Sequence, residues 1–345
     1  MRKLSFITSL MLVLTLCAAN LVFSQTQIPK AAPNAKAAAG KAALDFPVEG
    51  RKAKNGRGYS ANLSALTQSP KRIALVSFYG FDPGITRVTA SSYSTAFTTT
   101  TTTTTRTRSA GNGGEIAAMF YDKGLSGMRS TFSQYGMQLL TPDEFLDTEE
   151  KRTAYQAFRV QHSKLSEFAT NIGNQSLSVY YGYPEGYTVC DIENEPYANY
   201  TKTGLVGKKG KVVDVKVQQF RKDPKMTESL GYDLCKALGV DAVAVVYFTH
   251  TRPNAEKNML HNFNLAIFGP NPIALPDGKE DAALYSKGVF YAGARYYLGM
   301  DGLPFRDYNK KKPETQAMSD EGIDHILTGL STAVGTYIQK STGGK

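Results

Sequence analysis

Residues 239–248 read Gly-Val-Asp-Ala-Val-Ala-Val-Val-Tyr-Phe, and this stretch decides the fold. It is the strongest buried-strand pattern in the chain, because a continuous apolar run of this length is typical of a strand covered on both faces. A helical pattern over about 227–238 leads directly into it. A helix followed at once by a buried strand favours an α/β domain.

A second strand of this kind is predicted over 71–78, followed by a turn at Tyr79-Gly80-Phe81-Asp82-Pro83-Gly84. Apolar residues at helical spacing predict a helix over 115–135, and a short strand follows at 137–140. Thr141-Pro142-Asp143-Glu144 has the N-cap, proline and acidic first turn that begin a helix, and a longer helix is expected over about 150–172.

Further strands are predicted near 261–268 and 289–298, and an amphipathic helix over 320–339 closes the chain. The fold class we expect is therefore α/β, a mixed sheet flanked by helices over residues 66–340. A β-rich insert is expected at about 145–222, with strands near 176–183 and at the alternating stretch 211–218.

Eight consecutive threonines, Thr98 to Thr105, dominate the segment 85–114. Threonine favours extended backbone, but a uniform run cannot define a strand register. We expect a mobile Thr-rich surface loop here. A long hairpin arm is the alternative, and O-linked sugar on the threonines is a further option that the sequence leaves open.

The first 24 residues have the layout of a secretory signal peptide: Arg2 and Lys3, then an uncharged apolar run over Leu4 to Leu16, then small-residue cleavage sites. The apolar run is shorter than the roughly 20 residues that a membrane-spanning helix needs, so we predict no transmembrane helix. We expect an exported protein, periplasmic or outer-membrane-associated in a Gram-negative-type cell and otherwise secreted. Cys17 suggests a lipoprotein, but Leu16 stands where a small residue is expected.

Residues 25–65 are predicted to be a disordered basic linker, since they are rich in Ala, Lys, Pro and Gly. The whole chain carries a net charge of +10, and loss of Arg2 and Lys3 with the signal leaves +8. Seven cations and two acids place +5 of this charge between Gln25 and Leu63. We expect peripheral attraction of the linker to an anionic surface, with a solvated linker as the alternative, and no nucleic-acid partner.

No catalytic motif stands out, and we predict no catalytic residue, no cofactor and no metal site. His250 and His261 could approach each other across a turn, but the four histidines, which include His162 and His325, have no metal-ligand spacing. Asp191, Glu193 and Glu195 would share one face of an extended segment, as a carboxylate pair or a calcium ligand set would. A solvated strand edge is the alternative for these acids.

Two cysteines remain after the signal, Cys190 and Cys235. In an oxidising compartment they can form a disulfide, and two separate buried thiols are the other interpretation.

Tyrosines are concentrated in the stretch 180–187, which contains Tyr180, Tyr181, Tyr183 and Tyr187. Tyrosine offers rigid, amphipathic area for contact with protein or sugar, so these four are our candidate partner-binding residues. A β-hairpin with ordinary tyrosine packing is the alternative.

Three of these segments together resemble an envelope family that includes the amino-terminal domain of TolB, the curli-secretion channel protein and the lipoprotein activators of penicillin-binding proteins. They are the strand 71–78 with Phe81-Asp82-Pro83-Gly84, the strand 137–140, and the helix that runs into Leu238-Gly239-Val240-Asp241 and its apolar strand. The resemblance implies a non-enzymatic, partner-binding envelope module.

Our hypothesis is therefore an exported envelope protein that acts through contacts with another envelope protein or a cell-wall polymer. One alternative is a secreted hydrolase that uses the acidic residues 191–195 with a histidine. Another is a subunit of an oligomeric outer-membrane pore or secretion assembly, with hairpins from the Thr-rich segment and from 205–220 crossing the membrane.

Overall fold

The structure is a computed structural model of the chain. It describes residues 58–60, 66, 69–95, 98–107, 113–162, 177–192, 224–254, 257–272, 285–297, 303–305 and 320–342. The predicted signal peptide and most of the predicted linker lie outside these residues. Gly58–Ser60, at the end of the predicted linker, form strand β1, so the prediction of disorder is wrong for these three residues.

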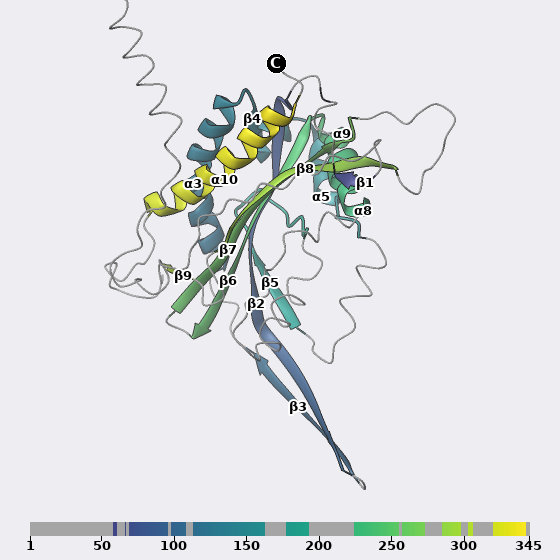
Figure 1. The fold of residues 1–345 in the computed structure, drawn as a ribbon, viewed down its shortest axis with the longest axis vertical. Helices are drawn as coiled ribbons and strands as arrows, with labels where there is room; N and C mark the ends of the chain where they lie inside the picture. Colours follow the sequence, from purple (N-terminus) through teal and green to yellow (C-terminus); the bar gives the residue numbers. More distant parts are fainter. Residues whose placement is uncertain are drawn as a thin grey trace, which may run out of the picture.

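In the described part of the chain the strands form one nine-stranded mixed sheet (Figure 1). Its main path runs β1-β8-β7-β6-β2-β3, while β4 and β5 pair with β2 and β9 pairs with β7. The remaining strands of the path are β2 (Arg72–Ser94), β3 (Thr99–Thr107), β6 (Ala242–Asn254), β7 (Lys257–Pro270) and β8 (Tyr285–Tyr297). The short strands are β4 (Gln138–Leu140), β5 (Leu177–Gly182) and β9 (Leu303–Phe305).

The predicted mixed sheet with flanking helices is confirmed, and β6 shows why the stretch at 239–248 signals it. Its alternate residues enter two different cores: Ala244, Val246 and Phe248 face one, and Val243, Val245 and Tyr247 face the other. Because both faces are covered, the strand has no polar face, and its sequence is continuously apolar.

The first core lies under α3 (Gly113–Gln134) and α10 (Asp320–Ser341), which pack side by side on one face of the sheet (Figure 1). Gly124 of α3 permits this close approach, because a Cβ at that position would lie 2.0 Å from Cδ1 of Leu327 on α10. Among the described residues, no helix has the length and apolar character to span a membrane.

The second core lies under the short helices α4 (Pro142–Phe145) and α5 (Glu149–Ala157) and a continuous helical segment at 224–238. That segment consists of α8 (Pro224–Glu228), a π-helical turn η5 (Ser229–Leu234) and α9 (Cys235–Leu238). It ends at Gly239, whose φ of 64° is left-handed and whose N–H bonds back to the last turn. A glycine adopts this conformation without strain, so the helix stops where the buried strand begins.

The predicted turn at 79–84 is wrong, because β2 continues through it to Ser94. On one edge β2 pairs with β6 as far as Phe81, and on the other β5 pairs with Gly80–Asp82 and again with Thr86–Arg87. Pro83 has no N–H to donate, and it falls in the register shift between Asp82 and Thr86. Neighbouring strands on both edges thus hold an apparent turn sequence in extended form.

The Thr-rich segment is the hairpin arm that stood as the alternative, not the expected loop. Thr99–Thr107 pair rung by rung with Thr86–Ser94, and the ribbon extends away from the body of the molecule (Figure 1). The turn is closed by Thr95, whose N–H and hydroxyl both donate to the carbonyl of Thr98. The continuing strand β2 supplies the register that a uniform threonine run lacks.

The helix expected over 150–172 is also shorter than predicted. α5 ends at Ala157, and Phe158 is extended with ψ of 135°. Residues 158–162 are not helical, and 163–176 lie outside the described residues, as does the predicted strand at 211–218. In its described part, the predicted β-rich insert therefore contributes one helix, α5, and one strand, β5.

Candidate functional site

The edge of β2 that faces away from β6 is only partly paired, and the gap positions the candidate site. β4 pairs with Arg72–Ala74, and β5 joins only from Gly80 onward. Between them the backbone of β2 is bonded by other groups. The hydroxyl of Tyr155 donates to the carbonyl of Val76 at 2.6 Å, because a buried carbonyl without a partner would be costly.

The segment 188–190 fastens to the same gap through side chains. The N–H of Thr188 donates to the Tyr155 hydroxyl at 3.1 Å, and its carbonyl accepts from the hydroxyl of Ser77 at 2.7 Å. The N–H of Cys190 donates to the Ser77 hydroxyl at 2.9 Å. Two buried hydroxyl side chains, Tyr155 and Ser77, therefore replace the missing strand.

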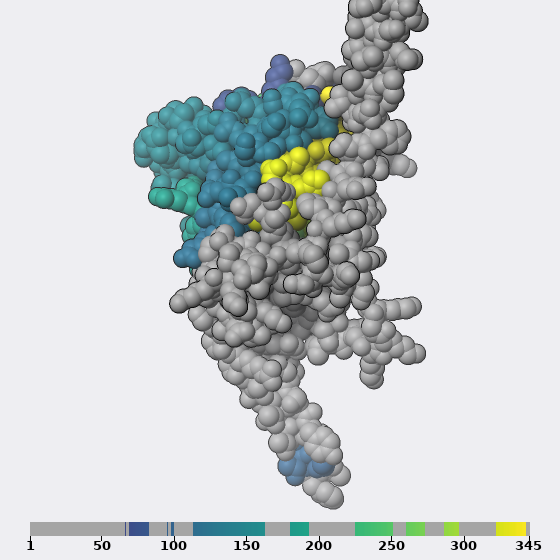
Figure 2. All heavy atoms as spheres, turned by 90° about the vertical axis from the view of Figure 1, so that its left-hand side faces the viewer, coloured from purple at the N-terminus to yellow at the C-terminus, as the bar shows by residue number. Residues whose placement is uncertain are grey.

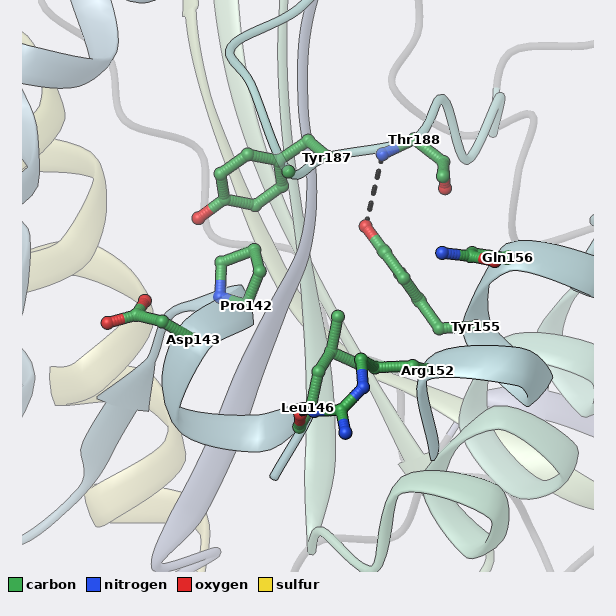
Figure 3. A pocket seen from close by; sticks show the side chains of 9 residues that line it. Pro142, Asp143, Leu146, Arg152, Tyr155, Gln156, Tyr187 and Thr188 are labelled. Carbon is green, nitrogen blue, oxygen red and sulfur yellow. Dashed lines mark hydrogen bonds between the residues drawn. The ribbon is translucent and has the colours of Figure 1, made fainter. Parts of the chain in front are cut away.

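A pocket of about 510 Å³ lies over this gap (Figure 3). It is lined by the start of α4, by α5 and by the turn after β5: Pro142, Asp143, Leu146, Arg152, Tyr155, Gln156, Gly186, Tyr187 and Thr188. Figure 3 shows Tyr155 and Tyr187 approaching from different elements, with Thr188 beside the Tyr155 hydroxyl. We name it the switch-point pocket, for the reason that follows.

Its position is set by the topology of the parallel strands β4, β2 and β6. After β2 and its arm, the chain covers the first face with α3 and returns as β4. After β4 it crosses to the second face with α4 and α5. It then adds β5 to the edge of β2 and, after the helical segment 224–238, arrives at β6 on the other side of β2. The connections from two adjacent strands thus leave to opposite faces. In open α/β sheets, ligands bind outside the carboxyl ends of strands at such switch points. Here the pocket lies beyond the carboxyl end of β4 and beside Val76 of β2.

The rim of the pocket consists of exposed polar side chains, and its floor consists of buried tyrosine side chains. Asp143, Arg152 and Gln156 are exposed, whereas Tyr155 and Tyr187 are only 1% and 5% exposed. Arg152 is held in place by its Nε, which donates to Glu149 at 3.0 Å, and by Nη1, which donates to the carbonyl of Leu146 at 2.8 Å. Asp143 accepts the Thr141 hydroxyl on Oδ1 at 2.5 Å.

The tyrosine hydroxyls of the floor are neutral at physiological pH. Burial raises the pKa of Tyr187 above its ordinary value, and the adjacent Tyr121 hydroxyl, which accepts from Tyr187 at 3.2 Å, adds to the effect. Burial likewise raises the pKa of Tyr155. Both hydroxyls therefore keep their protons and donate hydrogen bonds, Tyr155 to the Val76 carbonyl and Tyr187 to the Tyr121 hydroxyl.

The four candidate tyrosines lie in different surroundings. The Tyr187 side chain is in the pocket floor, and the Tyr181 hydroxyl donates to Asp191 at 2.8 Å while its ring packs on Tyr79. Tyr180 is half-buried beside Gly113 at the start of α3, where a Cβ would lie 2.7 Å from its ring. Tyr183 is 47% exposed. Packing thus explains Tyr181 and Tyr187 in full, and Tyr183 is left available to a partner.

The acidic residues predicted to act with a histidine are only partly described, since Glu193 and Glu195 lie outside the described residues. Asp191 bonds Tyr181, whose ring belongs with the second core. His250 lies beside Phe248, in the first core, with the ring centroids 5.8 Å apart. Asp191 and His250 are therefore on opposite faces of the sheet, and the structure does not bring this pair together.

His250 and His261 do lie on the two strands of one hairpin, near a register shift at which His250 faces Leu260. Within the described residues, no three His, Cys, Asp or Glu side chains are grouped to hold a metal ion.

Cys190 and Cys235 are both buried and free, so the disulfide interpretation is corrected to two separate thiols. Each sulfur lies near a different carbonyl, that of Val76 for Cys190 and that of Leu230 for Cys235. Burial raises the pKa of Cys190 to about 12 and also raises that of Cys235. Neither thiol is therefore ionised at neutral pH.

Sequence reasoning missed the rim residues Asp143, Arg152 and Gln156. The signal that was available is the helix start at Thr141, because helix starts after parallel strands lie at the carboxyl edge of the sheet, where ligands bind. The helix start predicted there is present, with Thr141 as the N-cap, and the N–H of Thr141 donates to Glu144 at 2.8 Å in a capping box. The sequence did not show that α5 and the turn at 184–187 would close around it.

The fold and pocket define a mixed α/β protein with a crevice at its strand switch point. Comparisons with protein-family models, curated proteins and solved structures find no match to this chain.

Proposed function

We propose that the protein is a non-enzymatic, exported envelope protein that acts by binding another protein. The observation that carries the proposal is Tyr183, which is 47% exposed, whereas the other large hydrophobic side chains whose burial the structure describes are more covered. Tyr183 shortly precedes Gly186 and Tyr187 of the pocket lining in the chain, and an exposed tyrosine is the kind of residue that dominates binding energy at protein interfaces. The resemblance to envelope partner-binding modules implies the same function.

The surroundings of Tyr183 support this role. On its N-terminal side, the Tyr181 hydroxyl is bonded to Asp191, and on its C-terminal side a turn is closed by the Tyr187 N–H, which donates to Pro184. Tyr183 is therefore held between two anchored residues. A side chain on a rigid platform loses little conformational freedom on binding, which favours affinity.

The test is capture of partners from the native envelope fraction by the full mature chain. Tyr183→Ala should lower capture by about tenfold, the effect of losing one hot-spot side chain. Tyr183→Phe should retain most of it. Tyr232→Ala is the matched control, because Tyr232 is a half-buried tyrosine on η5. Equal capture by wild type and Tyr183→Ala contradicts the proposed surface.

Replacement of Tyr181 or Tyr187 is a poor test, because each makes structural hydrogen bonds whose loss would itself disturb the fold.

Export and surface attachment are further parts of the proposal. Mass spectrometry of the native protein should find an N-terminus at Gln25, without lipid. If the basic linker is an electrostatic tether, about 0.5 M salt should release the protein from membranes, since salt screens such attraction. Retention at high salt contradicts the electrostatic tether and favours a lipid anchor at Cys17.

A second candidate function, a subunit of an oligomeric secretion assembly, is favoured by the β2–β3 arm. An isolated two-stranded ribbon is marginally stable in water, and strands with open edges pair readily with other chains. The arm has nine paired rungs, and the run Thr99–Thr105 contains no charge or proline to discourage pairing.

Analytical ultracentrifugation of the mature chain, with and without residues 88–105, tests this candidate. Oligomers that disappear when the arm is removed support it. A monomer at every concentration tested, with and without detergent, contradicts it.

A further inference from the structure

We propose that the switch-point pocket receives one apolar side chain from an extended peptide segment of the partner protein. This inference rests on the protein-binding function proposed above and names the chemistry that the pocket recognises. It is drawn from three properties of the pocket: its closed floor, its mixed rim and its aliphatic wall.

The closed floor excludes strand addition. The β2 carbonyl at Val76 already accepts from Tyr155, and Ser77 already bonds both the carbonyl of Thr188 and the N–H of Cys190. A peptide therefore cannot pair with the backbone of β2 in this gap. It must be held by the side chains around the pocket, which distinguishes this mode from recognition at an open sheet edge.

The rim offers both hydrogen-bond donors and hydrogen-bond acceptors to a ligand. Asp143 provides a carboxylate acceptor. Arg152 uses one N–H of Nε and one of Nη1 in the described contacts, and its other N–H groups on Nη1 and Nη2 can donate to a ligand. Gln156, exposed on α5, adds an amide that can donate and accept. A peptide backbone, with one donor and one acceptor per residue, matches such a rim. One carboxylate and one guanidinium give the rim no excess charge for a polyanion.

The wall distinguishes a peptide from a sugar. A sugar ring packs best on an exposed aromatic face, but Tyr155 and Tyr187 are 1% and 5% exposed, so their faces are covered. The aliphatic side chains of the lining are Pro142 and Leu146, and both are half-buried. Aliphatic surface of this kind is stabilised by burial of another apolar side chain. A pocket of about 510 Å³ has room for a side chain with its flanking peptide groups.

Photo-crosslinking in the native envelope tests the inference. Benzoylphenylalanine replaces Gln156 in one full-length variant, Tyr183 in a second and Thr153, an exposed residue of α5 outside the pocket lining, in a third. We expect the crosslink from position 156 to map by mass spectrometry to one segment of one protein, at or next to an apolar residue. Position 153 should give at least about tenfold less of it. A crosslink to cell-wall glycan, or none from position 156, overturns the inference.

Two substitutions in the 156 variant test the chemistry. Leu146→Phe fills the pocket and should reduce the mapped crosslink about tenfold, and Asp143→Asn, at an exposed position that leaves packing intact, should reduce it several-fold through the lost charged hydrogen bond. An unchanged yield in Asp143→Asn and in a folded Leu146→Phe overturns the inference. The Tyr183 variant separates the two proposals. A crosslink from 183 without one from 156 leaves the protein-binding function standing, and loss of both removes it.

Discussion

The two halves of β2 share an extended backbone but differ in the strands that pair with them. From Ile73 to Phe81 the strand pairs with β6 on one edge, and on the other edge β4 pairs with it up to Ala74 and β5 from Gly80. Its residues from Ile73 to Asp82 are buried. From Val88 to Ser94 the strand partner that the described residues provide is the threonine strand β3. The first half is extended because its apolar residues fit two cores. The second half continues that direction and gives β3 its register. Core packing therefore determines the extended conformation at one end of this strand. At the other end the strand is extended because it continues from the packed half.

The largest effect is expected from Phe78→Ala, in the buried half of β2. Phe78 is fully buried between the sheet and α3, with its ring edge-on to Tyr121 at 5.5 Å. Its truncation should lower the free energy of unfolding by about 3–5 kcal/mol, since it leaves a cavity in a close-packed core. Urea denaturation measures the loss. A change below about 1 kcal/mol would contradict the account of this half.

The second largest effect is expected from Tyr155, whose hydroxyl replaces a missing strand beside the buried half of β2. Tyr155→Phe removes the bond to the Val76 carbonyl and the acceptor for the Thr188 N–H. Leaving two backbone groups unsatisfied should cost about 1–3 kcal/mol in urea unfolding. Tyr121→Phe is the matched control, because it removes one hydroxyl contact, with Tyr187, and should cost less. Equal losses would mean that Tyr155 is not a strand substitute.

The helix start at the pocket predicts a pH dependence. Partial burial raises the pKa of Glu144, but hydrogen bonds from Thr141 and the ion pair with Arg129 outweigh it, so its pKa lies below the ordinary value of 4.5. A depressed pKa contributes stability that is present above pH 4.5 and lost as the pH falls through the folded-state pKa. Urea midpoints of wild type and Glu144→Gln should therefore differ at pH 7 and converge towards pH 3. A gap that widens in acid would contradict this.

The smallest effect is expected in the arm. Thr102 and Thr103 are replaced by proline in separate variants. Hydrogen-bonded and non-hydrogen-bonded positions alternate along an antiparallel strand, so one of these two neighbours donates its N–H to β2, and proline there removes that bond. Because β3 lies at the end of the sheet path and pairs with β2 alone among the described strands, the thermal midpoint of the body should change by less than about 2 °C, corresponding to under about 0.5 kcal/mol. A larger shift in both variants would show that the arm and the body fold as one unit, and the contrast between the halves of β2 would fail.

Several elements could be predicted from the sequence because their signals are local. The apolar run at 242–248 is a strand, the periodic stretch from Ile116 to Phe132 is a helix, and Thr141 caps a helix. The errors share a cause. At Gly80-Phe81-Asp82-Pro83 and at Thr98–Thr105 the local composition indicates a turn and a loop, but neighbouring strands supply the hydrogen bonds that keep both stretches extended.

The candidate site was predictable only in part. The tyrosine stretch at 180–187 does reach the pocket, through Tyr187, and it contains the exposed Tyr183. Arg152 and Gln156 come from a helix that carries no motif. They reach the pocket because α5 packs over the gap in the edge of β2.

The sequence by itself determined the main buried strands and the two long helices of the body, because hydrophobic periodicity follows from burying one face or two. Tertiary structure alone decided where β2 ends, whether the threonine run forms an arm, and which side chains surround the pocket. Those outcomes depend on which distant segments donate or accept hydrogen bonds and which of them pack over the strand. No local pattern contains that information.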